Sequence, residues 1–149
     1  MARGFTLIEL MVCLAVISVL AVVTVPVAEL VAQREREREL RSALTDIRNA
    51  IDAYKRAGDE GRLAGARPES GYPARLEVLL EGVPDKGGGT LYFLRRIPRD
   101  PFAADRKKAD WGLRSFASSA KAPRPGADVY DVYSLSEGTG LNGVPYREW

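Results

Sequence analysis

Two hydrophobic patterns follow each other along the first 57 residues. Leu10–Ala28 is an apolar run without a charged side chain, whereas Glu29–Arg41 holds eight charged residues in thirteen. Beyond it, apolar side chains recur at spacings of four and three residues, which places them on one face of a helix. These are Leu40, Leu44, Ile47, Ile51 and Tyr54. We predict one helix over residues 5–57, apolar all round in its first half and amphipathic in its second, ended by Gly58.

The apolar run is long enough to cross a membrane. Its 19 residues span about 28 Å as a helix, close to the roughly 30 Å hydrocarbon core of a bilayer. A start at Phe5 leaves length for tilt. The alternative is a cleaved secretory signal with Arg3 ahead of the run and a cleavage site at Val19–Ala21. A run longer than the 7–15 residues of such signals, with Glu9 near its start, favours the membrane helix.

Residues 58–149 contain shorter elements. A helix is predicted over 73–81, followed by Gly82, and strands over 90–94, 113–116 and 129–135. Glycines at 87–89 and prolines at 98, 101, 123 and 125 mark the turns. We therefore expect an α+β fold, in which a small antiparallel sheet packs on the apolar stripe of the long helix.

Composition and charge exclude several functions. The chain is 46% apolar and 28% charged, with a net charge of +2 that gives no electrostatic case for nucleic-acid binding. Histidine is absent, so histidine-based catalysis and histidine-ligated metals are excluded. Cys13 is the one cysteine, and it cannot form a disulfide within the chain. We expect no enzymatic activity.

Glu9 is a carboxylate at the start of an apolar helix. We expect it to have no stabilising partner in its own sequence neighbourhood, and a carboxylate inside a bilayer costs about 2.5–3.5 kcal/mol. Cleavage after Gly4 would create a free amine on Phe5, which can pair with Glu9 of a neighbouring copy at one definite axial stagger. The alternative is a carboxylate solvated by lipid headgroups at the membrane surface.

Pro26 interrupts the hydrogen bonding of the predicted helix. Its ring removes the N–H that would bond to the carbonyl of Val22, so a kink or local melting is expected there. An ordinary kinked membrane helix has the same feature, and Pro26 alone therefore decides nothing about function.

The segment Gly4–Glu9, with the apolar helix behind it, resembles the class III leader of type IV pilins and type II secretion pseudopilins. The resemblance implies that a prepilin peptidase cleaves between Gly4 and Phe5 and methylates the new amine of Phe5. It also implies that Glu9 contacts the amino terminus of the neighbouring subunit in a helical filament. Pro26 matches a proline at which family helices loosen on assembly.

Segments of the second half resemble the head of the major pseudopilin family, the G subunit of type II secretion. They are Gly71–Pro73, Ile97–Phe102, Trp111–Gly112 and Val129–Leu135. The resemblance implies a subunit of the bacterial inner membrane that polymerises with its own copies into a periplasmic pseudopilus. Minor pseudopilins, the prepilin peptidase and the inner-membrane assembly platform would be its partners. Alternatives are a type IV pilus pilin, a competence-type pseudopilin, or a secreted binding domain released by signal peptidase.

The resemblance divides the chain into a leader (1–4), a membrane and filament-core helix (5–28), an amphipathic half of the same helix (29–57) and a pseudopilin head (58–149). The head would lie in the periplasm. Four arginines at 34, 36, 38 and 41 favour the opposite orientation on a simple count of positive charges. The alternating charges of Arg34–Glu39 are interpreted either as a solvated collar or as a surface complementary to a neighbouring subunit.

Family heads typically hold a calcium ion in the loop after the last strand. Here that loop, residues 136–146, contains no aspartate, and Glu137 and Asn142 are weak ligand candidates. Calcium requires six to eight oxygen ligands, usually with more than one carboxylate. We therefore expect no metal and no cofactor, and a loop folded by its glycines and Pro145, with calcium held by Glu137 and Asn142 as the alternative.

Overall fold

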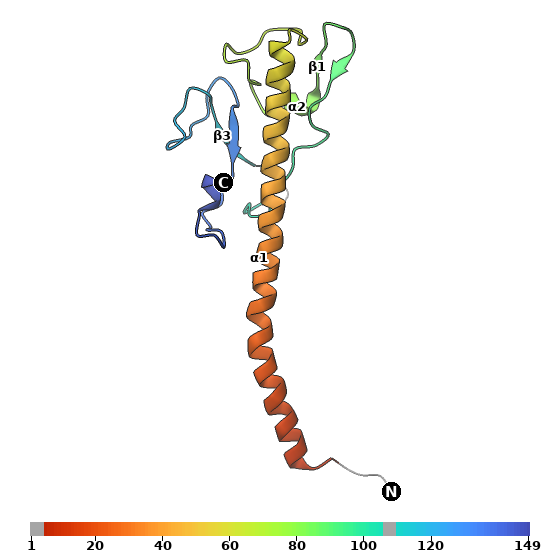
Figure 1. Ribbon diagram of the computed structural model, residues 1–149, viewed down its shortest axis with the longest axis vertical. Coiled ribbons are helices and arrows are strands. Elements are labelled where there is room, and N and C mark those ends of the chain that lie inside the picture. The colour runs from red at the N-terminus through yellow and green to blue at the C-terminus, as the bar shows by residue number, and fades with distance from the viewer. Residues whose placement is uncertain (1–4, 106–109) are drawn as a thin grey trace. The chain divides into compact units, whose positions relative to one another are not determined.

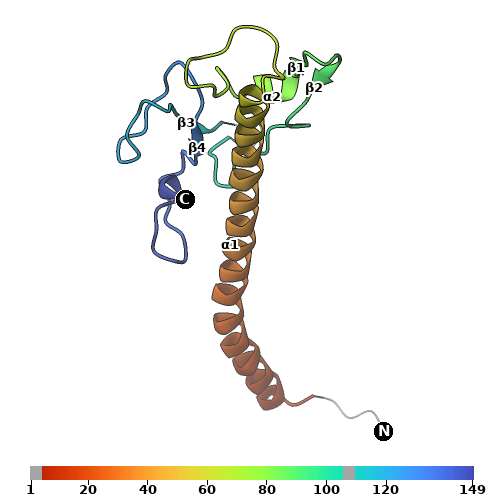
Figure 2. The ribbon, with the colours of Figure 1, turned by 45° about the horizontal axis from the view of Figure 1, so that its top comes forward.

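The computed structural model describes residues 5–105 and 110–149. Helix α1 (Leu7–Asp59) belongs to two compact units, Met1–Glu35 and Arg36–Trp149, which are described separately. In the first unit α1 is a continuous helix (Figure 2). Pro26 lies inside it, so of the predicted kink or local melting, melting does not occur in this structure, and the kink stays a prediction. Among the described residues, α1 is the one helix long and apolar enough to cross a membrane.

The C-terminal end of α1 differs from the prediction. The helix passes through Gly58, against which the Arg67 guanidinium packs, and ends at Asp59. Gly61 has a φ of +73°, its N–H donates to the carbonyl of Gly58, and the N–H of Arg62 donates to that of Ala57. This pair of bonds is a Schellman motif, which requires the left-handed backbone at Gly61. The prediction that the helix ends at Gly58 was therefore wrong.

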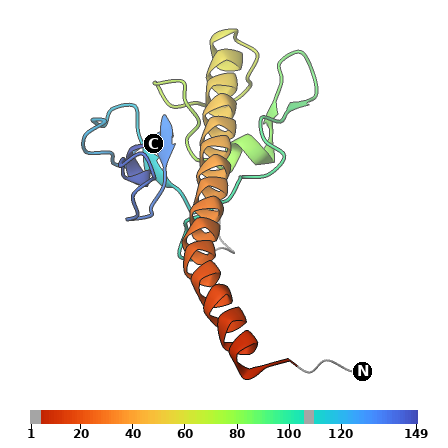
Figure 3. The ribbon, with the colours of Figure 1, turned by 60° about the horizontal axis from the view of Figure 1, so that its bottom comes forward.

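The second unit is built on the predicted apolar stripe of α1. All five stripe residues are buried, and residues from the rest of the unit complete the core around them. The stripe is Leu40, Leu44, Ile47, Ile51 and Tyr54, and the residues packed with it include Leu63, Leu79, Trp111, Val129 and Val132. Figures 1 and 3 show α2 with the first strand pair on one side of this part of α1 and the second pair on the other.

The first side consists of α2 (Val78–Glu81) and an antiparallel hairpin of β1 (Val83–Pro84) and β2 (Thr90–Leu91). The predicted helix over 73–81 is too long, because the carbonyl of Pro73 accepts from the N–H of Val129 instead of continuing a helix. Gly82 follows α2 as predicted, and the predicted turn at 87–89 lies inside the hairpin.

The second side pairs β3 (Gly112–Arg114) with β4 (Asp131–Tyr133), antiparallel, and ends in the 3₁₀ helix η1 (Tyr146–Glu148). The single three-stranded sheet suggested by the sequence is therefore two separate two-stranded sheets. Asp100, only 1% exposed, links the turn before β3 to β4, because its carboxylate accepts from the N–H of Phe102 and the hydroxyl of Ser134. The α+β class and the antiparallel pairing are confirmed.

Candidate functional site: the amino-terminal helix and a charged groove

Thr6 and Glu9 close the first turn of α1. The Glu9 N–H donates to the hydroxyl oxygen of Thr6 at 3.3 Å, while Oε2 of Glu9 accepts from the N–H and the hydroxyl of Thr6, each at 2.8 Å. This reciprocal arrangement is a capping box. The prediction that Glu9 lacks a partner in its own neighbourhood was therefore wrong, and the Thr-x-x-Glu spacing was the signal that could have revealed it.

The residues around the predicted processing site are open. Phe5 is 81% exposed, and the Glu9 side chain remains exposed while it caps the helix. Gly4 lies outside the described residues, so the predicted cleavage site is placed only by its neighbour Phe5. A carboxylate at the positive end of a helix dipole is stabilised there, and Glu9 is held where a neighbouring cation can reach it.

The first unit presents large apolar side chains on every side of α1. The exposed large apolar residues are Phe5, Leu7, Ile8, Leu10, Met11, Val12, Leu14, Val16, Ile17, Val19, Leu20, Val27, Leu30 and Val31. The hydroxyl of Ser18 donates to the carbonyl of Leu14 at 2.7 Å, so this polar group is satisfied inside the helix. A helix that is apolar all round requires lipid or other helices around it.

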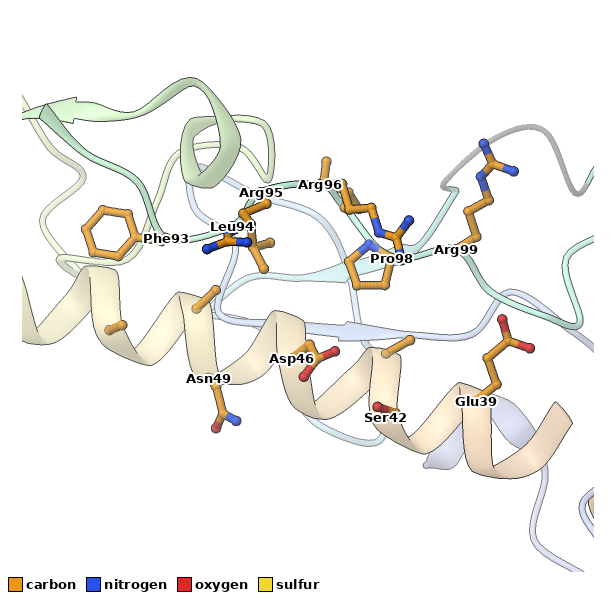
Figure 4. A pocket seen from close by; sticks show the side chains of 14 residues that line it. Glu39, Ser42, Asp46, Asn49, Phe93, Leu94, Arg95, Arg96, Pro98 and Arg99 are labelled. Atoms are coloured by element: carbon orange, nitrogen blue, oxygen red, sulfur yellow. The ribbon is translucent and has the colours of Figure 1, made fainter. Parts of the chain in front are cut away.

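A groove of about 830 Å³ lies in the second unit, between α1 and the segment that follows β2 (Figure 4). Its helix wall carries Glu39 and Asp46, and the facing segment carries Arg95, Arg96 and Arg99. Within residues 5–105 and 110–149, no ion pair joins these two walls. Both signs of charge are therefore present on one concave surface. Apart from the arginines themselves, no pattern in the sequence indicates this groove.

The two weak calcium candidates are not brought together as a cation site. Glu137 and Asn142 are exposed, and Oδ1 of Asn142 accepts from the N–H of Val144 at 3.1 Å. No group of three acidic or sulfur side chains able to hold a metal occurs in the described part of the chain. The side chains of Glu137 and Asn142 therefore do not form a metal-binding cluster with other acidic side chains among the described residues.

Comparisons with known proteins agree with this geometry. The family described as "Prokaryotic N-terminal methylation motif" matches residues 1–25, which include Gly4, Phe5 and Glu9. The type II secretion system core protein G of Klebsiella pneumoniae is 32% identical over 110 residues, 69% of this chain and 71% of that protein. The Escherichia coli (strain K12) protein of the same name is 33% identical over 106 residues, 69% and 68% of the two chains. No solved structure matches the chain significantly.

The methylation motif and the long helix that carries a small α+β head define a pilin-like protein. Among the families of pilin-like proteins, the identity and coverage of these two matches show to which one the chain belongs. The chain belongs to the family of the type II secretion system core protein G, the major pseudopilins. The alternative assignments to type IV pilins and to competence pseudopilins are not favoured.

Proposed function

We propose that this chain is a structural subunit that polymerises through its amino-terminal helix into the pseudopilus of a type II secretion system. The observation that carries the proposal is a helix segment apolar on every side that begins at a capped carboxylate, Glu9. Family membership supports it, because the relatives are named core proteins of that system. The role is assembly, and we assign no catalytic residue.

In this proposal Glu9 changes partners on assembly. In the single subunit Thr6 satisfies its carboxylate, which lowers the cost of a charge at the start of an apolar helix. In the filament, the amine of Phe5 on a neighbouring subunit approaches Glu9 and forms a charge-assisted hydrogen bond. That pair forms at one axial stagger only, so it selects how the apolar helices pack along the filament.

We further propose that prepilin peptidase cleaves between Gly4 and Phe5 and methylates Phe5, and that Pro26 lets α1 loosen in the filament core. Residues 5–28 would form the membrane and filament-core helix and 29–57 its amphipathic half, with the head in the periplasm. Its partners would be its own copies, minor pseudopilins and the inner-membrane assembly platform. The charged groove between α1 and Arg95–Arg99 is proposed as one contact surface between copies, because it presents charges of both signs that no ion pair among the described residues joins.

The mass of the amino-terminal peptide tests the proposal. The full chain is extracted from membranes in detergent, digested and analysed by mass spectrometry. We expect a first peptide that begins at methylated Phe5. A peptide that begins at Met1, near Val22 or at Glu29 would indicate a plain anchor or a secreted protein, and would contradict the proposed pseudopilin function.

A further inference from the structure

Glu37 is the one buried member of the charged segment Arg34–Glu39. Its five neighbours in that segment are exposed, whereas Glu37 is 5% exposed. Its Oε1 accepts from the N–H of Leu141 at 2.8 Å and from the hydroxyl of Tyr146 at 3.2 Å. The interpretation of the whole segment as a solvated collar is therefore wrong at this position. Glu37 joins α1 to the loop 136–146, more than a hundred residues further along the chain.

The loop directs hydrogen-bond donors toward this carboxylate. Three carbonyl oxygens of the loop accept bonds from within it: Gly138 accepts from the N–H of Tyr146, Gly140 from Gly143, and Val144 from Gly140. The indole N–H of Trp149 also donates to the carbonyl of Val144, at 3.2 Å. A calcium site requires the reverse arrangement, in which carbonyl and carboxylate oxygens converge on a centre.

Side-chain packing holds the loop in this conformation. The Tyr146 ring stacks on the Phe102 ring with centroids 4.0 Å apart. It also forms a T-shaped pair with the Trp149 ring, with centroids 5.1 Å apart. A Cβ on Gly138 would lie 3.0 Å from the Tyr146 ring, a tight contact that would press on the ring. The hydroxyl of Tyr146 is therefore placed at Glu37 by the contacts of its ring with Phe102, Trp149 and Gly138.

We propose that the Glu37 carboxylate fastens the loop 136–146 to α1 in place of the calcium ion that the family resemblance implies for this loop. The Glu37 carboxylate accepts hydrogen bonds from an N–H and an O–H group of the loop, whereas a calcium ion would be bound by oxygen atoms of the loop. Because the anchor is a side chain of the same polypeptide, the order of the loop does not depend on calcium. The inference rests on contacts inside the second unit and not on the proposed role in secretion.

Hydrogen exchange of the full chain in detergent micelles tests this inference, with the loop peptides as the readout. For the unaltered chain, we expect the same exchange rate at Leu141 in calcium chloride and in a calcium chelator. Glu37→Ala leaves the Leu141 N–H without its acceptor, so its exchange rises about tenfold or more. Glu39→Ala is the matched control, because it removes an exposed carboxylate two residues away on the same helix and leaves the loop unchanged.

A second variant keeps the test decisive if Glu37→Ala fails to fold. Glu37→Gln retains an acceptor oxygen but no charge, and we expect exchange at Leu141 between that of the unaltered chain and that of the alanine variant. Slower loop exchange or a higher Tm of the unaltered chain on adding calcium would overturn the inference. Loop exchange unchanged in both Glu37 variants would overturn it as well. Neither result would affect the amino-terminal mass that tests the proposed function.

Discussion

Glu9 caps its own helix through Thr6. One oxygen of the Glu9 carboxylate accepts hydrogen bonds from the N–H and from the hydroxyl of Thr6, each at 2.8 Å. Glu9 therefore has two separable properties, an acceptor for the cap and a negative charge. A capping role needs only the acceptor, whereas a pair with a neighbouring amine needs the charge.

Glu9→Gln separates these two properties. The glutamine oxygen still accepts from the Thr6 N–H, so the helix start and cleavage after Gly4 should be unchanged. We expect the number of filaments to fall about tenfold or more, because the ionic attraction to the Phe5 amine is lost. The measurement is the filament yield from membranes by electron microscopy, alongside the mass of the amino-terminal peptide.

Two further variants complete this experiment. Glu9→Ala removes both properties and should be at least as defective in assembly as Glu9→Gln. Thr6→Ala removes the hydroxyl of the cap and keeps the charge, so it should still form filaments. Normal filaments from Glu9→Gln would rule out the charge pair and leave Glu9 as a helix cap.

A substitution at Ile47 tests how much the stability of the head depends on its packing against α1. It is fully buried in the stripe that α1 presents to the core of the second unit. Ile47→Ala should lower the free energy of unfolding by about 2–5 kcal/mol, the range for truncation of a buried aliphatic side chain. Urea unfolding in detergent, followed by fluorescence of the buried Trp111, gives the value.

Ile17→Ala is the matched control for Ile47→Ala. This variant has the same isoleucine-to-alanine substitution on the same helix, but Ile17 is exposed in the first unit. Its effect on unfolding of the head should lie within about 0.5 kcal/mol. Equal losses in the two variants would show that the stripe is not the main support of the head.

Arg48 joins α1 to the C-terminal half of the second unit. Its Nε donates to Oδ1 of Asp131 at 2.8 Å, and its Nη2 donates to the carbonyls of Val132 and Trp149 at 3.1 and 2.7 Å. A lysine cannot reproduce this fork. Arg48→Lys should therefore reduce stability by about 1–3 kcal/mol, whereas Arg56→Lys, on an exposed part of α1, should not. Equal thermal stabilities of the two variants would contradict this role.

The sequence predicted the elements that depend on a pattern of neighbouring residues. The stripe from Leu40 to Tyr54 and the turn at 87–89 follow from spacing and glycine content. The cap formed by Thr6 and Glu9 was equally local and was overlooked. β1 was missed because two residues, Val83 and Pro84, are too short to show periodicity, and they are ordered by their pairing with β2.

Two contacts of the second unit that the sequence did not reveal are long-range. Glu37 meets Leu141 across 104 positions, and Arg48 meets Trp149 across 101. The pattern of Arg34–Glu39 does not distinguish its buried glutamate from the exposed ones. Which charge is buried is decided by the fold of the C-terminal loop, and a single sequence does not encode that contact in any local pattern.

Asp85 should give the hairpin turn a pH dependence. The Arg62 guanidinium donates to it at 2.9 Å and the Gly87 N–H at 3.1 Å, and both hold the pKa of this carboxyl below its ordinary value. A pKa that is lower in the folded state stabilises the turn above about pH 4, and the stabilisation is lost as the pH falls through the lowered value. An NMR titration should show the Gly87 amide shift at that lower pH and no such shift in Asp85→Asn.

The charged groove offers the last prediction. Asp46 lies on its helix wall and Arg96 on the facing segment (Figure 4). If copies of the chain meet here, reversing one charge places like charges together, so Asp46→Arg and Arg96→Asp should each reduce filament yield several-fold. Arg124→Asp makes the same change on an exposed arginine outside the groove and should leave the yield unchanged. Restored yield in the double variant would place Asp46 and Arg96 across one interface, and full yield in both single variants would remove the groove from assembly.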